Sequence, residues 1–464
     1  MLRSDTDPDR YGGSVRRLLP FSFVARSLAI CLAATVAGCA QKAASGPAHT
    51  SPAVAHESVH LATFDYLWQR VADGYPDPTL GGVDWNQVKD DLRPAASAAT
   101  TADELRPVLT EMLGRVGVSH FAIVPGDVYR IGSGEGPRGE LGMDATLLQG
   151  AVYVVSVEPN GPAHQAGVHP GDRITAVEDT NLDAIVAELA DGQGPRRAAA
   201  AVGSVLRDVL HPVVGEPTRL QIERDGTPSS ITVRPAPIQG DVFKVGELPA
   251  TRVETIVRVD DPDGPNGPIA PVLVIRFSMF AVPNGAAIRR AVMQAKLDGV
   301  AACVIDLRGN PGGLPLVAQG IAGHFVARRS ASLGTFQTRE STLEFNIRPR
   351  VSAERLDGPL AILVDGRSAS SSEIFASGMQ ELERAIVVGE QSSGLALMSS
   401  FERLPNGDRA QLVFADLQTP SGKRLEGHGV TPDIVITPTP EALRAGQDPI
   451  LDTALAAVRT PETP

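Results

Sequence analysis

The stretch Ala302–Gly313 (ACVIDLRGNPGG) gives the strongest indication of the fold. Its first six residues have the apolar character of a buried strand, and they run into a turn of glycine, asparagine and proline. Glycines in such a turn let main-chain N–H groups approach a ligand closely. We therefore expect a strand that ends at a site, where the amides of Gly312 or Gly313 could form an oxyanion hole. A plain strand-to-helix turn is the alternative.

Strands and helices alternate on both sides of this stretch. The pattern predicts strands at Val272–Phe277, Ala302–Leu307, Pro359–Val364 and Ala385–Val388, and helices at Asn284–Leu297, Leu316–Val326 and Ser371–Glu383. Such alternation implies parallel strand pairing with helices packed over the sheet. The expected fold class of residues 238–440 is therefore an α/β core. Residues 441–464 are expected to form a C-terminal tail that contains a short helix.

A second segment of this core has the form of a turn that carries a nucleophile. Asp365–Glu373 (DGRSASSSE) follows a strand, turns through small residues and begins a helix. The N-terminus of that helix directs N–H groups towards a side chain at the turn. Ser370 is therefore a candidate nucleophile, and the amide of Ser371 is a candidate oxyanion donor. Serines that only cap a helix would give the same pattern.

Residues 139–237 differ in character, because short β-type runs alternate there with Gly, Pro and Asn turns. Within them, Pro159–Val168 (PNGPAHQAGV) and the following Pro170–Ile174 (PGDRI) resemble a PDZ domain. The resemblance implies a loop whose amides bind the carboxylate of a peptide C-terminus. The residues of that loop would be Glu140, Leu141, Gly142 and Met143. A PDZ fold used only as a spacer is the alternative.

The N-terminal part of the chain has three predicted segments. Residues 1–38 contain basic residues and a short apolar run, and they are typical of an export signal. The run ends in Val-Ala-Gly-Cys39, which resembles the bacterial lipobox and predicts a lipid on Cys39, although an ordinary signal peptide is an alternative. Residues 39–57 have the composition of a flexible tether. These features predict a protein of the cell envelope, anchored to a membrane by lipid.

Residues 58–125 are predicted to form a helical domain. Apolar residues recur at helical spacing from Leu61, and a second helix begins after Thr101. Thr101 and Glu104 have the form of a capping box. The domain ends at the pair Ser119–His120.

Charge and cysteine content exclude several function classes. The net charge of −12, without a cluster of Lys and Arg, argues against nucleic acid as a partner. Cys303 is the only cysteine that would remain after export and lipidation, so no intrachain disulfide is expected. No Cys or His cluster has the spacing of metal ligands, and neither a metal nor an organic cofactor is implied.

Taken together, these segments resemble the carboxyl-terminal processing protease family. Further motifs that carry the resemblance are Thr419–Lys423 (TPSGK) and Gly427–Asp433 (GHGVTPD). The resemblance implies a protease core of the crotonase-like or ClpP-like type. It also implies a serine endopeptidase that processes or degrades proteins from or near their C-termini, with a protein or peptide substrate as partner.

One position departs from the family pattern. Many bacterial members use a Ser–Lys pair, and Leu395 stands where the lysine would be. The tricorn-like branch instead uses a histidine that directly follows a second serine, with a glutamate before a G-V-x-P-D segment. Ser119, His120 and Glu426 match that pattern, and the resemblance implies His120 as the base for Ser370. Two alternatives are Lys423 as the base, and an inactive lipoprotein that binds a peptide or a small hydrophobic ligand.

Overall fold

The computed structural model describes residues 58–126, 138–193, 195–244, 251–264 and 269–459. The predicted signal segment, the tether and Cys39 lie outside these residues. Within the described part of the chain, no helix has both the length and the apolar character needed to cross a membrane.

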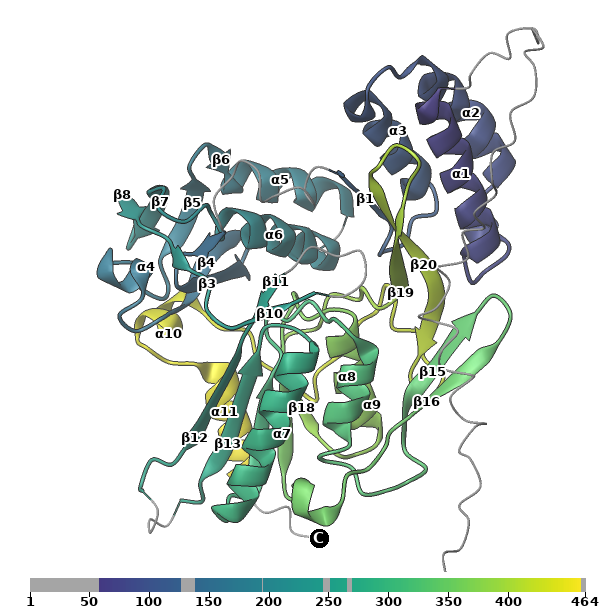
Figure 1. The fold of residues 1–464 in the computed structure, drawn as a ribbon. Coiled ribbons are helices and arrows are strands. Elements are labelled where there is room, and N and C mark those ends of the chain that lie inside the picture. Colours follow the sequence, from purple (N-terminus) through teal and green to yellow (C-terminus); the bar gives the residue numbers. More distant parts are fainter. Residues whose placement is uncertain (1–57, 127–137, 194, 245–250, 265–268, 460–464) are drawn as a thin grey trace, which may run out of the picture. The chain divides into compact units, whose positions relative to one another are not determined.

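A six-stranded sheet forms the centre of the core (Figure 1). Its strands, in spatial order, are β12 (Thr255–Asp260), β13 (Val272–Phe277), β14 (Ala302–Asp306), β17 (Leu360–Val364), β18 (Ile386–Gly389) and β21 (Ile434–Val435). Neighbours from β13 to β21 pair in parallel, as the alternation of elements predicts. Edge strand β12 pairs antiparallel with β13 and was not predicted.

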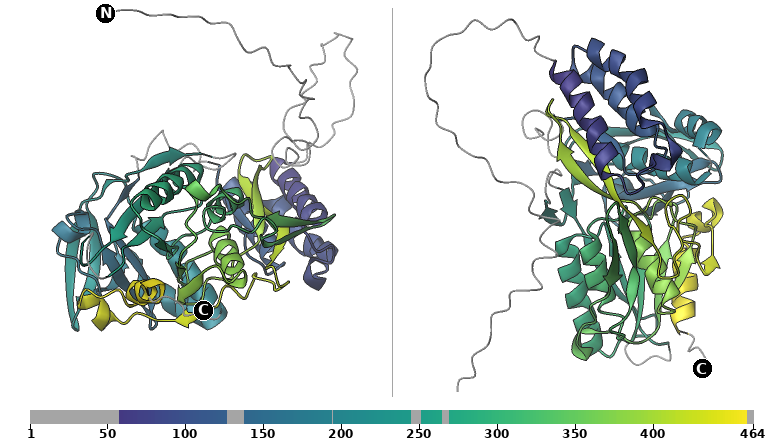
Figure 2. Two further views of the ribbon diagram at one scale, coloured as in Figure 1. Left: turned by 90° about the horizontal axis from the view of Figure 1, so that it is seen from below. Right: turned by 90° about the vertical axis from the view of Figure 1, so that its right-hand side faces the viewer.

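Helices cover both faces of this sheet. Leu273 and Ile275 of β13 pack with α7 (Val282–Leu297), α8 (Pro315–Ala322) and α9 (Ser371–Glu381). Val272 and Val274 point the opposite way and pack against α11 (Pro449–Arg459). Figure 2 shows α7 and α11 on opposite sides of the strands. The predicted tail therefore contributes a helix to the core.

A second sheet, which the sequence pattern did not reveal, joins distant parts of the chain. Its strands are β1 (Ala122–Val124), β15 (Ser332–Thr338), β16 (Thr342–Asn346), β19 (Met398–Arg403) and β20 (Arg409–Gln418). Strand β1 pairs with β20 directly after Ser119 and His120. This pairing holds the predicted base next to the C-terminal half of the α/β core.

The helices of residues 58–125 share their hydrophobic core with this second sheet. They are α1 (Val59–Gly74), α2 (Trp85–Ala98) and α3 (Ala102–Gly114). Leu397, Leu404 and Leu412 pack among their apolar residues. The capping box at α3 differs slightly from the prediction: Thr101 caps Glu104 N at 3.2 Å, but the Glu104 carboxylate accepts from Thr100 N at 2.7 Å.

Residues 139–237 form a β-rich region with three helices. The main sheet has the order β3 (Met143–Leu148), β4 (Ala151–Val157), β5 (Arg173–Val177), β7 (Thr218–Arg224) and β8 (Thr227–Val233), with β6 (Thr180–Asn181) beside β5. Strand β2 (Gly139–Glu140) pairs with β9 (Ala236–Pro237). The helices are α4 (Pro162–Gln165), α5 (Leu182–Gln193) and α6 (Pro195–Val209).

Helix α6 was not predicted, and it packs against edge strand β3. Val202 and Leu206 of α6 are buried in the same hydrophobic cluster as Ala145 of β3. Two smaller elements complete the fold: the hairpin of β10 (Asp241–Phe243) with β11 (Thr251–Val253), and helix α10 (Pro440–Arg444).

Candidate active site

Ser370 lies at the turn between β17 and α9, where the sequence placed the nucleophile. Its backbone has φ 55° and ψ −117°, a conformation that L-residues rarely adopt. Such a residue stores of order 1–3 kcal/mol of strain and persists only where its surroundings hold it. Here Ser370 N donates to Leu395 O at 2.8 Å and to Glu373 Oε2 at 3.1 Å. The turn therefore presents Ser370 in a fixed, strained conformation.

The glycine turn after β14 lies against Ser370. A Cβ on Gly312 would be 2.7 Å from Ser370 Cβ, so only glycine fits there. The amide of Gly312 donates to Asn310 Oδ1 at 2.9 Å. In the part of the chain that the structure describes, the amides of Gly313 and Ser371 have no acceptor. Two unengaged N–H groups thus lie next to the candidate nucleophile.

The two serines after Ser370 have structural hydrogen bonds. Ser371 Oγ donates to Gly313 O at 2.8 Å, and Ser372 Oγ donates to Asn310 O at 2.9 Å. Both side chains are buried. These bonds tie the start of α9 to the glycine turn, which favours Ser370 over its neighbours as the nucleophile.

Ser119, His120 and Glu426 form a hydrogen-bonded relay. Ser119 Oγ donates to Glu426 Oε2 at 2.8 Å, and His120 Nδ1 lies 2.7 Å from Ser119 Oγ. A hydroxyl has one proton, so Ser119 must accept from His120 Nδ1–H. His120 Nε2 is then unprotonated in the neutral ring and can accept a proton. Ser119 N also donates to Glu426 Oε1 at 2.9 Å.

The surroundings of His120 keep its ring neutral. Burial lowers the pKa of His120, and the negative charge of Glu426 opposes that effect only in part. A neutral imidazole with a free Nε2 is the state required of a general base. Like Ser370, His120 has a positive φ, of 61°. Both residues are therefore held in strained conformations, as is common at functional sites.

The segment Gly394–Ala396 connects the relay to the nucleophile. Leu395 O accepts from Ser370 N, and Ala396 N donates to Glu426 Oε2 at 3.0 Å. The two halves of the site are thus attached to consecutive residues of one segment. Within the described residues, no hydrogen bond joins His120 to Ser370. A direct proton transfer therefore needs the two side chains to approach in the substrate complex.

Leu395 contributes only main-chain groups to this arrangement. Its N–H donates to Glu373 Oε2 at 3.0 Å, and its carbonyl accepts from Ser370. Lys423, the alternative base, has a side chain that is 76% exposed and lies 3.7 Å from Glu381 Oε1. Lys423 therefore pairs with a carboxylate at the surface.

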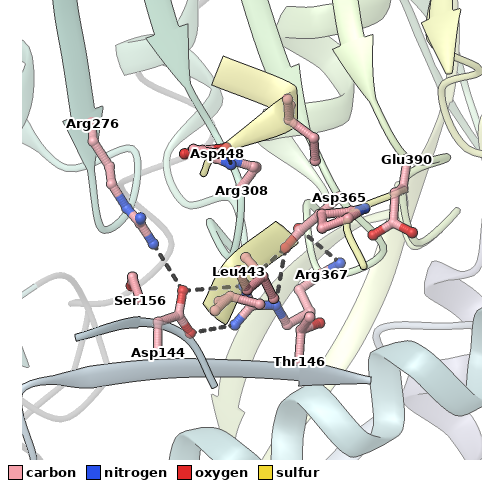
Figure 3. A pocket seen from close by; sticks show the side chains of 13 residues that line it. Asp144, Thr146, Ser156, Arg276, Arg308, Asp365, Arg367, Glu390, Leu443 and Asp448 are labelled. Atoms are coloured by element: carbon pink, nitrogen blue, oxygen red, sulfur yellow. Dashed lines mark hydrogen bonds and ion pairs between the residues drawn. The ribbon is translucent and has the colours of Figure 1, made fainter. Parts of the chain in front are cut away.

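Arg367, three residues before Ser370, joins the β-rich region to the core (Figure 3). Its guanidinium donates to Asp144 Oδ1 at 2.6 Å, to Ala145 O at 3.0 Å and to Asp365 Oδ2 at 2.9 Å. Arg276 of β13 also donates to Asp144, at 2.8 Å. Although burial alone would raise it, the pKa of Asp144 lies well below its usual range because Arg367 and Arg276 surround the carboxylate. We call these contacts the Arg367 clasp.

A small polar cavity of about 60 Å³ lies beside the Arg367 clasp. Its charged lining residues are Asp144, Arg276, Arg308, Asp365, Arg367, Glu390 and Asp448. A cavity of this size holds a few water molecules and no peptide side chain of ordinary size. It therefore belongs to the interface between the β-rich region and the core rather than to a substrate site.

The predicted carboxylate loop has mixed features. Gly142 has φ 67°, and a Cβ there would lie 2.8 Å from Pro162 Cδ. Among the described residues, the amides of Leu141 and Gly142 have no acceptor, which suits a carboxylate ligand. Glu140 lies in β2, and burial raises the pKa of its carboxyl. Met143 begins edge strand β3.

Edge strand β3, to which a peptide would add, is already in contact with the rest of the chain. Helix α6 packs against it, and the Arg367 guanidinium donates a hydrogen bond to the carbonyl oxygen of Ala145. Gly203 of α6 lies so close to Arg367 that a Cβ would be 2.9 Å from Arg367 Cγ. Strand addition along β3 therefore requires α6 and Arg367 to move.

Sequence reasoning missed Glu373, Arg367 and Asp144. The spacing of Ser370 and Glu373 matches a capping box, which is a detectable signal for the glutamate. Arg367 and Asp144 belong to segments 223 residues apart, so no local pattern marks their contact. Glu373 bonds to the nucleophile turn directly and Asp144 contacts it through Arg367, so their roles depend on tertiary neighbours.

Comparisons with known proteins match three parts of the chain. Peptidase family S41 matches residues 271–436, and the PDZ domain matches residues 139–234. The Tricorn protease C1 domain matches residues 60–114. The matched segments coincide with the core, the β-rich region and the three N-terminal helices described above.

Two curated relatives and one solved structure illustrate the similarity. Carboxyl-terminal-processing peptidase 3, chloroplastic, of Arabidopsis thaliana is 25% identical over 80% of this chain and 67% of its own length. Tricorn protease homolog 1 of Streptomyces coelicolor is 28% identical over 85% of this chain, which spans only 34% of that relative. The photosystem II D1 C-terminal processing protease has a TM-score of 0.57 at 19% identity, covering 88% of this chain and 98% of that one, and it shares the fold.

Proposed function

Since the chain belongs to the carboxyl-terminal processing serine peptidases and carries a PDZ domain, we propose that it is an endopeptidase with Ser370 as nucleophile and His120 as general base. The observation that supports this most directly is the relay of Glu426, Ser119 and His120. It leaves His120 Nε2 free, and the segment Gly394–Ala396 attaches the relay to Ser370. The parallel core sheet with its helices also supports the crotonase-like or ClpP-like assignment.

In the proposed reaction, Ser370 Oγ attacks the carbonyl carbon of the scissile peptide bond. His120 Nε2 takes the hydroxyl proton as the C–O bond forms. The resulting imidazolium donates from Nδ1 to Ser119, whose hydroxyl donates to the Glu426 carboxylate. The C–N bond then breaks as His120 returns the proton to the amine. Water repeats the sequence on the acyl-enzyme and releases Ser370.

The negative charge of the tetrahedral intermediate requires N–H donors close to Ser370. We assign this role to Gly313 and Ser371, because both amides are unengaged, whereas the amide of Gly312 is bonded to Asn310. Gly312 would instead provide the close approach of the turn to Ser370. Two such donors in a desolvated site lower the barrier by several kcal/mol.

Substitution of Ser370 and His120 tests the proposed mechanism. On an unstructured protein substrate, Ser370→Ala and His120→Ala should each lower kcat by at least about 1000-fold, because members of a catalytic unit are not additive. Ser372→Ala is the matched serine control, and it should stay within about tenfold of the wild type because its hydroxyl only bonds Asn310. Near-wild-type turnover of His120→Ala together with loss of activity in Lys423→Ala would overturn the histidine assignment.

The substrate and its recognition form a further part of the proposal. The unengaged amides of Leu141 and Gly142 suit the carboxylate of a protein C-terminus. We therefore propose that the PDZ domain binds substrates at their C-terminal ends, with Glu140 and Met143 flanking the loop. Blocking that carboxylate by amidation should raise KM and leave kcat nearly unchanged, because it removes binding distant from the reacting bond.

The cell envelope is the proposed location. Its support is the sequence Val-Ala-Gly-Cys39 after a short apolar run. In that proposal Cys39 carries a lipid that anchors the protein to a membrane. Labelling with palmitate in cells tests it, since the label should be absent from Cys39→Ser.

A further inference from the structure

Glu373 is a buried carboxyl group beside the nucleophile, and the mechanism above gives it no role. It lies in the first turn of α9, three residues after Ser370, and its side chain is 0% exposed. In the described part of the chain, no lysine, arginine or histidine pairs with it. A buried carboxyl group without a cation is costly, which calls for an explanation in terms of its neighbours.

Four hydrogen-bond donors face the Glu373 carboxylate. Oε1 accepts from Ser392 Oγ at 2.5 Å and from Gly394 N at 2.7 Å. Oε2 accepts from Leu395 N at 3.0 Å and from Ser370 N at 3.1 Å. Three of these donors are main-chain amides, which cannot accept a proton. The arrangement therefore favours an ionised carboxylate, which only accepts, over a protonated carboxyl group.

The three main-chain donors belong to the two segments that must keep a fixed relation during the reaction. One is the strained turn at Ser370. The other is Gly394–Ala396, whose last residue donates to Glu426 of the relay. Glu373 is thus bonded to both the nucleophile and the segment that carries the relay.

We propose that Glu373 is a positioning residue of the peptidase reaction, whose carboxylate fixes the nucleophile turn against the segment Gly394–Ala396 and so sets the distance from Ser370 to His120. The proposal rests on the proposed function of Ser370 and His120. Because reacting groups must approach to about 3–3.5 Å, a shift of about 1 Å between these segments is enough to cost about 100-fold in rate.

The charge on Glu373 makes this positioning dependent on pH. Burial raises the pKa of Glu373 to about 7, although its four hydrogen bonds favour the ionised form. Below that pH the carboxyl group gains a proton, and its hydrogen bonds to the main-chain amides weaken because the negative charge is lost. Burial lowers the pKa of His120, which Glu426 faces from the relay, so that ring stays neutral to lower pH. The decrease of kcat at low pH, which is the acidic limb of the pH–rate profile, should therefore report the protonation of Glu373 rather than that of His120.

Glu373→Gln, compared with Glu390→Gln, tests the proposal. Glu390 is a matched control because it is a partly buried glutamate with a raised pKa that lines the small cavity beside the Arg367 clasp. At about pH 8, Glu373→Gln should lower kcat about 100-fold with KM nearly unchanged. Its acidic limb should move to lower pH, where His120 titrates. Glu390→Gln should keep both the rate and the limb of the wild type.

Two results would overturn the proposal: wild-type kcat in Glu373→Gln, or a loss of rate with the acidic limb unmoved. A measurement that does not depend on catalytic turnover distinguishes failure of this proposal from failure of the proposed serine mechanism. In the Ser370→Ala protein, pH-difference infrared spectroscopy should detect a buried carboxylic acid that titrates near pH 7. The signal should vanish in Ser370→Ala/Glu373→Gln, and its persistence there would contradict the assignment to Glu373.

Discussion

At the scale of single residues, the proposed relay divides between two side chains the role that a single carboxylate has in a Ser-His-Asp triad. In the proposed mechanism, Ser119 fixes the tautomer of His120, and Glu426 supplies the charge that stabilises the imidazolium. Glu426 is also held by Ala396 N, so its position is coupled to the segment beside Ser370. Removing the charge and removing the hydroxyl should therefore have different consequences.

Glu426→Gln should lower kcat and also move the titration of His120. The negative charge of Glu426 raises the pKa of His120, so its loss lowers that pKa further. Proton transfer to a less basic ring is weaker, and we expect kcat to fall by about 10²–10⁴-fold. The pKa of His120, followed by NMR in the Ser370→Ala protein, should decrease. Ser119→Ala keeps the Glu426 carboxylate. A larger decrease in the pKa of His120 in Ser119→Ala than in Glu426→Gln would contradict this division of roles.

At the scale of elements, the approach of the glycine turn to α9 determines the geometry of the oxyanion site. A Cβ on Gly312 would lie 2.7 Å from Ser370 Cβ and 2.9 Å from Ser371 N. Gly312 also has φ 102°, which disfavours any other residue. The glycine turn and the start of α9 can therefore lie this close together only if residue 312 is glycine.

Gly312→Ala should lower kcat by at least about 100-fold while the protein stays folded. The added methyl group pushes the turn away from Ser370, which displaces the amides assigned to the oxyanion, and the loss of one such donor costs about 10²–10³ in kcat. Gly422→Ala is a matched control, because Gly422 also has a positive φ, of 83°, but open space around it. Equal losses of activity in the two variants would mean that backbone strain alone is responsible.

The elements that could be predicted from sequence are those with a strong local pattern. Strands β13, β14 and β17 are continuous apolar runs, and they were placed almost to the residue. Strands β15, β16 and β19 are partly exposed and show no regular alternation of buried and exposed residues, so the local pattern did not mark them. This holds although β15 with β16, and β19 with β20, are antiparallel pairs of neighbouring segments. Ser119 and Glu426 are 307 residues apart, and only the family resemblance suggested that they meet.

At the scale of the whole molecule, the Arg367 clasp connects the PDZ domain to the nucleophile turn. Asp144 is on the PDZ side, and Arg367 and Arg276 are on the peptidase side. Breaking a buried charge pair by removing one partner costs about 3–5 kcal/mol, because the other charge is left buried. The clasp should therefore be a large local contributor to the free energy of unfolding.

Asp144→Asn should lower the free energy of unfolding by about 3 kcal/mol, as measured with denaturant. Arg367 keeps Asp365 as a partner, so the loss should lie at the low end of that range. Asp183→Asn is the matched control within the PDZ domain, because Asp183 pairs with Arg173 in a partly exposed position. That pair should contribute about 0–1 kcal/mol. Equal effects of the two substitutions would contradict a special role for the clasp.

The pairing of β1 with β20 has a consequence for the timing of activity. Because the relay joins Ser119 to Glu426, a ribosome must synthesise the chain at least as far as residue 426 before Ser119 gains its carboxylate partner. Closing a loop of this length is also slow compared with forming the local helices. Folding intermediates and truncated nascent chains would therefore lack a complete relay. Under the proposed mechanism, full peptidase activity would therefore begin only after the C-terminal part of the core has folded.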